Sequence, residues 1–193
     1  PYRLKEHEHH SSPSIGISLY RGNEQTVDTL LKHADLAMYQ AKSAGRNAVR
    51  FFDTAMQHNV AAHAELVSDL RRAIELQQLH LYYQVQVDDN NRPLGAEALL
   101  RWIHPQRGMV MPEQFIPVAE ESALIIEIDD WVLETACRQL VLWGGNAQTR
   151  DLLLTVNVSA KHFAMPDFVD KVASMLRKHQ VNPARLKLEL TER

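Results

Sequence analysis

The order of strand-like and helix-like segments in the second part of the chain constrains its fold most strongly. The segments 79–87 and 93–103 both read as strands, and the turn between them contains Asp88-Asp89-Asn90-Asn91. This connection is too short for a parallel crossover, so the two strands should pair antiparallel. Two further strands are then expected, at 152–159 and 185–192. The helical stretches between the strands are 112–120, 124–143 and 167–179. This order predicts a hairpin followed by a βαβαβ arrangement with right-handed parallel crossovers.

The expected fold class is therefore α/β, a partial (β/α) barrel of the TIM type whose first strand is antiparallel. A complete barrel of this kind needs about 250 residues. The expected strands and helices of the barrel all lie within 54–193, which is little more than half of that length. We therefore expect roughly half a barrel, in a chain cut at both ends. Such a half barrel exposes an unpaired strand, so we expect the chain by itself to associate or to swap strands.

The first part of the chain, 1–53, has too few elements to bury a core of its own. It contains a strand-like segment at 14–19, a helix-like apolar spacing that runs from Val27 to Ala41, and a short apolar stretch at 49–52. We interpret 1–53 as the C-terminal fragment of one domain and 54–193 as the N-terminal part of another. Within the second part, 54–77 is expected to be a linker helix, because its apolar residues recur at helical spacing.

Composition excludes several classes of protein. Hydrophobic residues make up 45% and charged residues 23%, and the net charge is −3, which is typical of a globular protein without a basic field for a nucleic-acid polymer. No apolar run approaches the length of a membrane span. The single cysteine, Cys137, suits a reducing compartment. We expect a cytoplasmic location, although a longer parent protein can be anchored in a membrane upstream of this chain.

Polar side chains occupy one face of several expected strands. Parallel strands of a barrel are normally apolar on both faces, so these residues need a reason. Many lie toward the C-terminal ends of the strands, where barrel active sites are built. The residues concerned are Glu97 and Arg101 in the second strand, Thr155, Asn157 and Ser159 in the third, and Lys187, Glu189 and Thr191 in the fourth.

Glu97, Asn157 and Glu189 form a candidate metal site if they converge. Two carboxylates and one amide offer only oxygen ligands, which suit Mg²⁺ or Mn²⁺ rather than zinc. Arg101 shares a face with Glu97 and has the geometry to hold a phosphate. A metal ion beside an arginine indicates phosphoryl chemistry. From spacing alone the alternative stays open that these polar residues only solvate the ends of the strands.

Several motifs in 55–193 resemble the EAL domain, the bacterial cyclic-di-GMP phosphodiesterase. The signature segment is Glu97-Ala98-Leu99-Leu100-Arg101-Trp102. The accompanying motifs follow in the family's order and are Tyr83-Gln84, Pro112 with Phe115-Ile116-Pro117-Val118-Ala119-Glu120, Asn157-Val158-Ser159 and Glu189-Leu190-Thr191-Glu192. The resemblance implies a metal-dependent enzyme that opens cyclic-di-GMP to the linear product pGpG.

The resemblance also assigns roles to individual residues. It makes Glu97, Asn157 and Glu189 the ligands of Mg²⁺ or Mn²⁺, and it implies a homodimer through the EAL domain. The other implied roles are contact with cyclic-di-GMP for Gln84 and Arg101, and support of a loop near the site and the dimer interface for Glu192. Ala123 and Asp129 stand where the family frequently has glycine.

The resemblance leaves the catalytic residues unknown. The family's Asp-Asp metal motif, the lysine that assists the water and further glutamates are all expected after residue 193. We therefore expect the intact parent to be the enzyme and this chain by itself to be inactive. The alternatives are a non-catalytic receptor that binds cyclic-di-GMP and a domain that serves only as an interaction scaffold.

The N-terminal part resembles the end of a GGDEF domain, the diguanylate cyclase fold. The residues that carry this resemblance are 34–47, with Ser14-Ile15-Gly16 as the preceding strand. Lys42 and Arg46 match family positions that hold nucleotide phosphates, but in this fragment we interpret them as a basic helix end that favours the helix dipole. The sequence does not show whether this domain makes nucleotide, and the upstream sensor stays unknown.

A few further residues have an ordinary interpretation. His7, His9 and His10 in the segment HEHH are expected in an exposed loop rather than in a metal site. Cys137 and the helix tryptophans Trp131 and Trp143 are expected to pack in the core. His104 follows the second strand and receives no role.

Overall fold

The structure is a computed structural model that describes residues 2–4, 7–9, 12–20, 22 and 25–191. The chain divides into two compact units, Pro1–Glu65 and Leu66–Arg193, and each is described by itself. Helix α2 (Thr54–Glu75) begins in the first unit and ends in the second.

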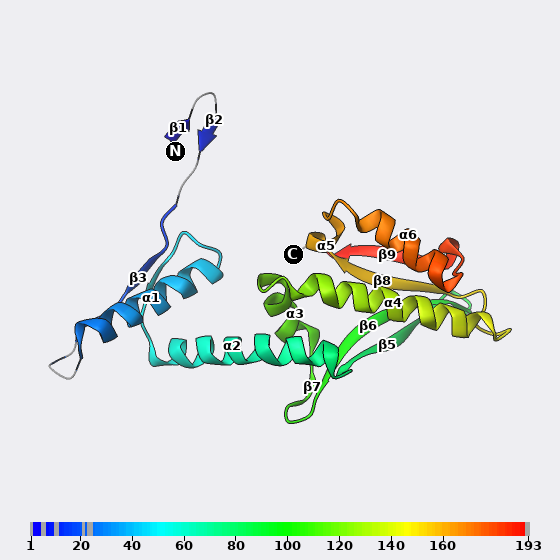
Figure 1. Cartoon of the computed structure of the whole chain (residues 1–193), viewed down its shortest axis with the longest axis horizontal. Helices are drawn as coiled ribbons and strands as arrows, with labels where there is room; N and C mark the ends of the chain where they lie inside the picture. The colour runs from blue at the N-terminus through cyan, green and yellow to red at the C-terminus, as the bar shows by residue number, and fades with distance from the viewer. Residues whose placement is uncertain (1, 5–6, 10–11, 21, 23–24, 192–193) are drawn as a thin grey trace. The chain divides into compact units, whose positions relative to one another are not determined.

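The N-terminal unit contains two small sheets and one long helix (Figure 1). Strands β1 (Tyr2–Leu4) and β2 (His7–His9) pair antiparallel. Strands β3 (Ile15–Ile17) and β4 (Val49–Phe51) pair parallel, and α1 (Val27–Ser43) lies between them in sequence. The expected loop at HEHH was thus wrong for His7 and His9, which lie in a paired strand. His10 lies outside the described residues.

Glycine at position 16 allows β3 to pack directly on α1. A Cβ atom at Gly16 would collide with backbone atoms of Ala34 and Met38. On the helix side, Ala37 and Ala41 are fully buried. The helix begins at Thr26, whose hydroxyl accepts a hydrogen bond from the Thr29 N–H, as an N-cap residue does.

The C-terminal unit is built on one mixed sheet. Its strand order is β5-β6-β8-β9, and β7 pairs with the C-terminal end of β6. β5 and β6 are antiparallel, whereas β6 and β8, and β8 and β9, are parallel, as the short hairpin turn and the helical connections predict. The bounds are β5 (Leu79–Val87), β6 (Pro93–His104), β7 (Gly108–Val110), α3 (Pro112–Glu121), α4 (Leu124–Gly144), β8 (Leu153–Ser159), α5 (Ala160–Phe163), α6 (Phe168–His179), a 3₁₀ turn (Pro183–Arg185) and β9 (Leu186–Thr191).

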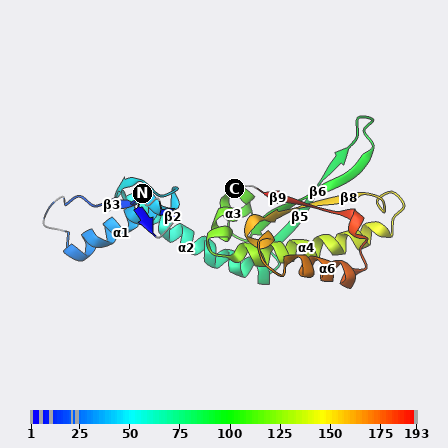
Figure 2. The same ribbon diagram turned by 90° about the horizontal axis from the view of Figure 1, so that it is seen from above.

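Helices α4 and α6 run along one face of this sheet, as Figure 2 shows. Between them and the strands lies the core, in which Trp102, Phe115, Ile128 and Leu154 are fully buried. Cys137 is buried there as well, and Trp131 and Trp143 are partly buried against the same cluster. The expectation that these three residues serve packing is confirmed.

Two buried residues, Asp69 and His104, join the end of α2 to the β6–β7 hairpin. Asp69 contacts Arg72 at 2.5 Å, and its other carboxylate oxygen lies 3.4 Å from both His104 Nε2 and Arg107 Nη2. His104 Nδ1 accepts hydrogen bonds from the Gln106 and Arg107 N–H groups. Burial alone would raise the pKa of Asp69, but the Arg72 hydrogen bond and the neighbouring positive charges lower it. His104 is therefore a structural residue of this hairpin.

Ala123, where the family frequently has glycine, precedes α4 in the left-handed conformation with φ 62°. That conformation costs an L-residue about 1–2 kcal/mol, whereas glycine adopts it freely. The Ala123 side chain is exposed, so no packing is lost when it is removed. We expect Ala123→Gly to raise the free energy of unfolding in urea by about 0.5–1 kcal/mol, less than the full relief of strain, because glycine also adds entropy to the unfolded chain. The control Ala173→Gly, inside α6, should lower it by about 1 kcal/mol; destabilisation by both would contradict the prediction.

Candidate functional site

The strand register brings four of the predicted site residues to the same region of the sheet. Gln84 on β5 is directly opposite Glu97 on β6. On the next strands, Glu97 is paired with Thr155 of β8, and Asn157 of β8 is paired with Glu189 of β9. Paired residues on neighbouring strands share a face, and residues two apart on one strand share it as well. Gln84, Glu97, Asn157 and Glu189 therefore belong to one polar face.

Glu97 and Asn157 are in direct contact. The Asn157 side-chain nitrogen donates a hydrogen bond to Glu97 Oε1 over 2.8 Å, although the residues are 60 apart in sequence. With its nitrogen held in this way, the amide keeps its oxygen available as a ligand. Glu189 is the next residue across the sheet, and its carboxylate accepts a hydrogen bond from Lys187 Nζ at 2.7 Å.

Thr155 leaves an unpaired polar atom beside these residues. Its side chain is almost fully buried, and its hydroxyl has no hydrogen-bond partner in the described part of the chain. Buried hydroxyls are normally satisfied, and this one lies between Glu97 and Lys187 in the register. Two carboxylates, an amide oxygen and a hydroxyl fit a hard divalent cation. Among the described residues, no group of three or more His, Cys, Asp or Glu side chains could hold a metal, so the predicted set depends on its amide.

Arg101 lines a cavity of about 320 Å³ at the C-terminal end of β8, together with Asn157 and Ser159. Residues of α3 and α4 form the other walls, Glu120 and Asp129 among them. The Arg101 guanidinium donates a hydrogen bond to the Leu100 carbonyl at 2.7 Å. The structure therefore places Arg101 and Asn157 together at one cavity.

A larger cavity, of about 670 Å³, lies in the N-terminal unit. Its walls include Ser18, His33 and Phe52, and the His33 ring stacks on Phe52 with centroids 3.6 Å apart. None of the predicted site residues line it. We therefore place the candidate site on the polar face of the sheet beside the smaller cavity. Arg101 and Asn157 line that cavity, whereas Gln84, Glu97 and Glu189 are not among its lining residues.

Asp129 is a buried acid at the site that sequence reasoning did not assign. Its side chain is 8% exposed, and the residue lines the same cavity as Asn157. Burial raises the pKa of this carboxyl, against the effect of its hydrogen bonds from Ser159. The sequence feature that could have identified Asp129 is its position as an acid on the apolar face of α4, among the buried residues Ile125, Ile128 and Val132.

Three further residues were singled out from the sequence. Glu192 lies outside the described residues. Lys42 lies in the last turn of α1, as a basic helix end does, and Arg46 follows the helix with φ 64°. No helix in the described part of the chain is long and apolar enough to cross a membrane.

Comparison with protein-family models shows which families the two parts of the chain match. The model of the EAL domain matches residues 67–193. The chain belongs to the EAL domain family. The model of the diguanylate cyclase GGDEF domain matches residues 1–48, so the end of a GGDEF domain precedes the EAL domain. Both resemblances expected from the sequence are confirmed.

Two curated relatives come from Pseudomonas aeruginosa. The bifunctional diguanylate cyclase/cyclic di-GMP phosphodiesterase MucR is 48% identical over 195 residues, covering 100% of this chain and 28% of MucR. The cyclic di-GMP phosphodiesterase NbdA is 35% identical over 182 residues, covering 93% of this chain and 23% of NbdA. The chain thus spans less than a third of either relative.

A solved structure supports the fold. The phosphodiesterase PaMucR in complex with c-di-GMP is 46% identical, with a TM-score of 0.64 over 66% of this chain and 52% of that chain. This similarity to an EAL domain, which has a TIM-barrel-like fold, confirms the expected α/β fold class. The names of these two relatives and of this solved structure all refer to cyclic-di-GMP.

Proposed function

We propose that the protein carrying this chain is a Mg²⁺- or Mn²⁺-dependent phosphodiesterase that hydrolyses cyclic-di-GMP to pGpG. The observation that carries the proposal is the contact between Glu97 and Asn157, with Glu189 next to Asn157 across the sheet. This contact joins two of the three proposed ligands. The phosphodiesterase names of the relatives support the reaction.

In this proposal the polar face of the sheet holds the metal ion. Glu97, Asn157 and Glu189 are its ligands, and the hydrogen bond to Glu97 orients the Asn157 amide. The chemistry that such an ion would supply when held there is polarisation of a phosphate oxygen and activation of water. Lys187 contacts Oε1 of Glu189 at 2.7 Å, so the other carboxylate oxygen would serve as the ligand unless the lysine is displaced.

Arg101 and Gln84 bind the dinucleotide in this proposal. The Arg101 guanidinium can hold a phosphate with two parallel hydrogen bonds. To do so it exchanges its bond to the Leu100 carbonyl for one to the ligand. Gln84 is exposed and opposite Glu97, which places an amide next to the metal site.

No residue of this chain is assigned as the general base, and we propose that the chain by itself does not turn over substrate. In this proposal, the intact protein supplies the further metal ligands and the group that accepts the proton from water. We also propose that the intact protein forms a homodimer through its EAL domain.

The test is chromatographic detection of pGpG after incubation of the intact protein with cyclic-di-GMP and Mg²⁺ or Mn²⁺. We expect pGpG to accumulate, to stop accumulating in excess EDTA, and to accumulate again when Mn²⁺ is restored. Turnover that continues in EDTA would contradict the metal site. The 193-residue chain, tested beside the intact protein, should yield no pGpG.

A receptor that binds cyclic-di-GMP without hydrolysis is the second candidate. The ion pair between Lys187 and Glu189 favours it, because a lysine on a proposed ligand replaces the metal's charge. Binding of cyclic-di-GMP by the intact protein in calorimetry, without pGpG at any metal concentration, would identify the receptor. Detection of pGpG would exclude it.

A further inference from the structure

A buried polar cluster lies where β8 ends and α5 begins. Asp129 of α4 accepts two hydrogen bonds from Ser159 on a single carboxylate oxygen, Oδ2. The Ser159 N–H donates over 3.0 Å and the Ser159 hydroxyl over 2.6 Å. The same hydroxyl accepts a hydrogen bond from the His162 N–H and so caps α5. Ser159 is thus held by its backbone and its side chain together.

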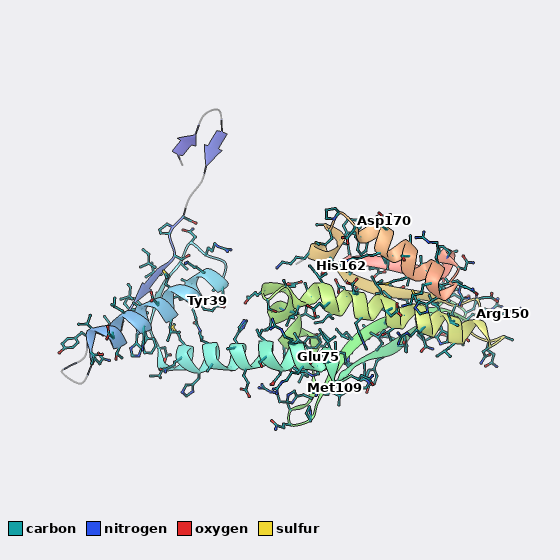
Figure 3. The ribbon with its side chains drawn as sticks, viewed as in Figure 1. Tyr39, Glu75, Met109, Arg150, His162 and Asp170 are labelled. Carbon is teal, nitrogen blue, oxygen red and sulfur yellow. The ribbon has the colours of Figure 1, made fainter. Side chains whose placement is uncertain are left out.

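The remaining charged groups of the cluster surround His162, which is labelled in Figure 3. Its ring is fully buried, with Nδ1 3.6 Å from Asp129 Oδ2 and Nε2 3.2 Å from Asp130 Oδ1. Neither ring nitrogen makes an aligned hydrogen bond within the described residues. Lys171 of α6 approaches Asp130 at 3.9 Å. Asp130 therefore belongs to this cluster without an observed contact to Ser159.

The strand pairing of β8 changes along its length. β6 and β8 are paired from Gly95 and Leu153 only as far as Ala98 and Val156. Beyond Val156, the described pairing of β8 is with β9 alone, up to Ser159. Asn157 lies in this one-sided segment, two residues before Ser159. The hydrogen bonds of Ser159 to Asp129 add a contact from α4 at the end of this segment.

We infer that Asp129 is a positioning residue, which fixes the end of β8 through Ser159 and thereby holds the Asn157 amide at the metal site. This inference rests on the proposed function for the role of Asn157. Asp129 and Asn157 line the same cavity, and Ser159, which Asp129 holds, is two residues from Asn157 in β8. Partners that orient metal ligands change metal affinity by about 10–100-fold when they are removed.

Two substitutions of Asp129 separate its hydrogen bonds from its charge. Because one oxygen accepts both bonds, the amide oxygen of Asp129→Asn can accept both as well. Asp129→Ala removes both bonds. Two readouts apply to the intact protein: hydrogen exchange of the Asn157 to Ser159 backbone followed by mass spectrometry, and Mn²⁺ affinity from the spectrum of free Mn²⁺. We expect Asp129→Ala to speed the exchange and weaken Mn²⁺ binding, each at least about 10-fold, and Asp129→Asn to stay within about 3-fold of the parent protein.

Asp130→Asn is the matched control, since it alters the neighbouring acid beside His162 without touching Ser159. We expect both readouts to remain unchanged. Equal weakening by Asp130→Asn and Asp129→Ala would overturn the inference, because the effect would then come from the acidic charge. Unchanged exchange in a folded Asp129→Ala protein would also overturn it. If Asp129→Ala fails to fold, weakened Mn²⁺ binding by the folded Asp129→Asn protein would do the same.

The two proposals fail in different ways. If the unsubstituted protein binds no Mn²⁺, the proposed function is wrong and so is the metal role of Asn157. If it binds Mn²⁺ and Asp129→Ala speeds the exchange without weakening that binding, the proposed function stands and the positioning role is wrong. Faster exchange together with weaker binding supports both.

Discussion

Glu97→Gln should lower the metal-dependent turnover of cyclic-di-GMP by the intact protein about 10³-fold. Glutamine keeps the shape of the side chain and an oxygen that can accept the hydrogen bond from Asn157. It removes the negative charge that a divalent cation requires. A metal ion contributes several kcal/mol to transition-state stabilisation, and each 1.4 kcal/mol corresponds to about a tenfold rate change.

The measurement is the initial rate of pGpG formation at saturating Mn²⁺, with Mn²⁺ affinity measured beside it. The control is Glu127→Gln, which removes the same charge from an exposed position on α4 and should leave the rate unchanged. A Glu97→Gln protein that retains more than about a tenth of the rate would argue against Glu97 as a ligand. Unchanged folding of both variants, checked by circular dichroism, limits the comparison to the site.

Trp102→Ala should destabilise the C-terminal unit by about 3–5 kcal/mol, the usual cost of removing a buried tryptophan. Trp102 is fully buried on β6, and its ring lies edge-on to Phe115 with centroids 5.7 Å apart. Its indole N–H donates to Gln78 Oε1 at 3.1 Å, so the substitution also leaves that oxygen unpaired. A domain is stable by only about 5–15 kcal/mol, so the loss is a large fraction of the total.

Urea unfolding monitored by circular dichroism measures this effect as a lower midpoint. Leu142→Ala, at a side chain that is 70% exposed, is the control and should change the free energy of unfolding by less than about 0.5 kcal/mol. Trp102→Phe should fall between the two, because it keeps part of the ring packing and loses the bond to Gln78. A loss below about 1 kcal/mol for Trp102→Ala would show that the core rearranges to fill the space.

Local sequence patterns were sufficient to predict most of the elements. The turn at 88–91 set an antiparallel hairpin, and helical apolar spacing located α4 within one residue of its observed ends. Elements that depend on distant partners were missed. β7 has only three residues and exists because β6 extends to pair with it. α5 has four residues and begins with a cap whose serine is held by Asp129.

The part of the candidate site that depends on local sequence pattern could also be predicted. The two-residue period of a strand is enough to assign Asn157 and Ser159 to one face. The motif resemblance then selected Glu97, Asn157 and Glu189 from the other polar residues on these faces. Asp129 was not selected, because helical periodicity places it among core residues and says nothing of a partner 30 positions away.

The sequence by itself determined the α/β class, the family, the antiparallel first strand and the residues that the polar face offers. These properties follow from short-range periodicity, turn length and motifs, all of which can be read within a few residues. Only the tertiary structure decided that the Asn157 amide meets Glu97 and that Lys187 pairs with Glu189. It also decided that Asp129 holds Ser159 at the end of β8. Such contacts depend on strand register and on helix placement over the sheet, which are set by packing of the whole unit rather than by neighbours in sequence.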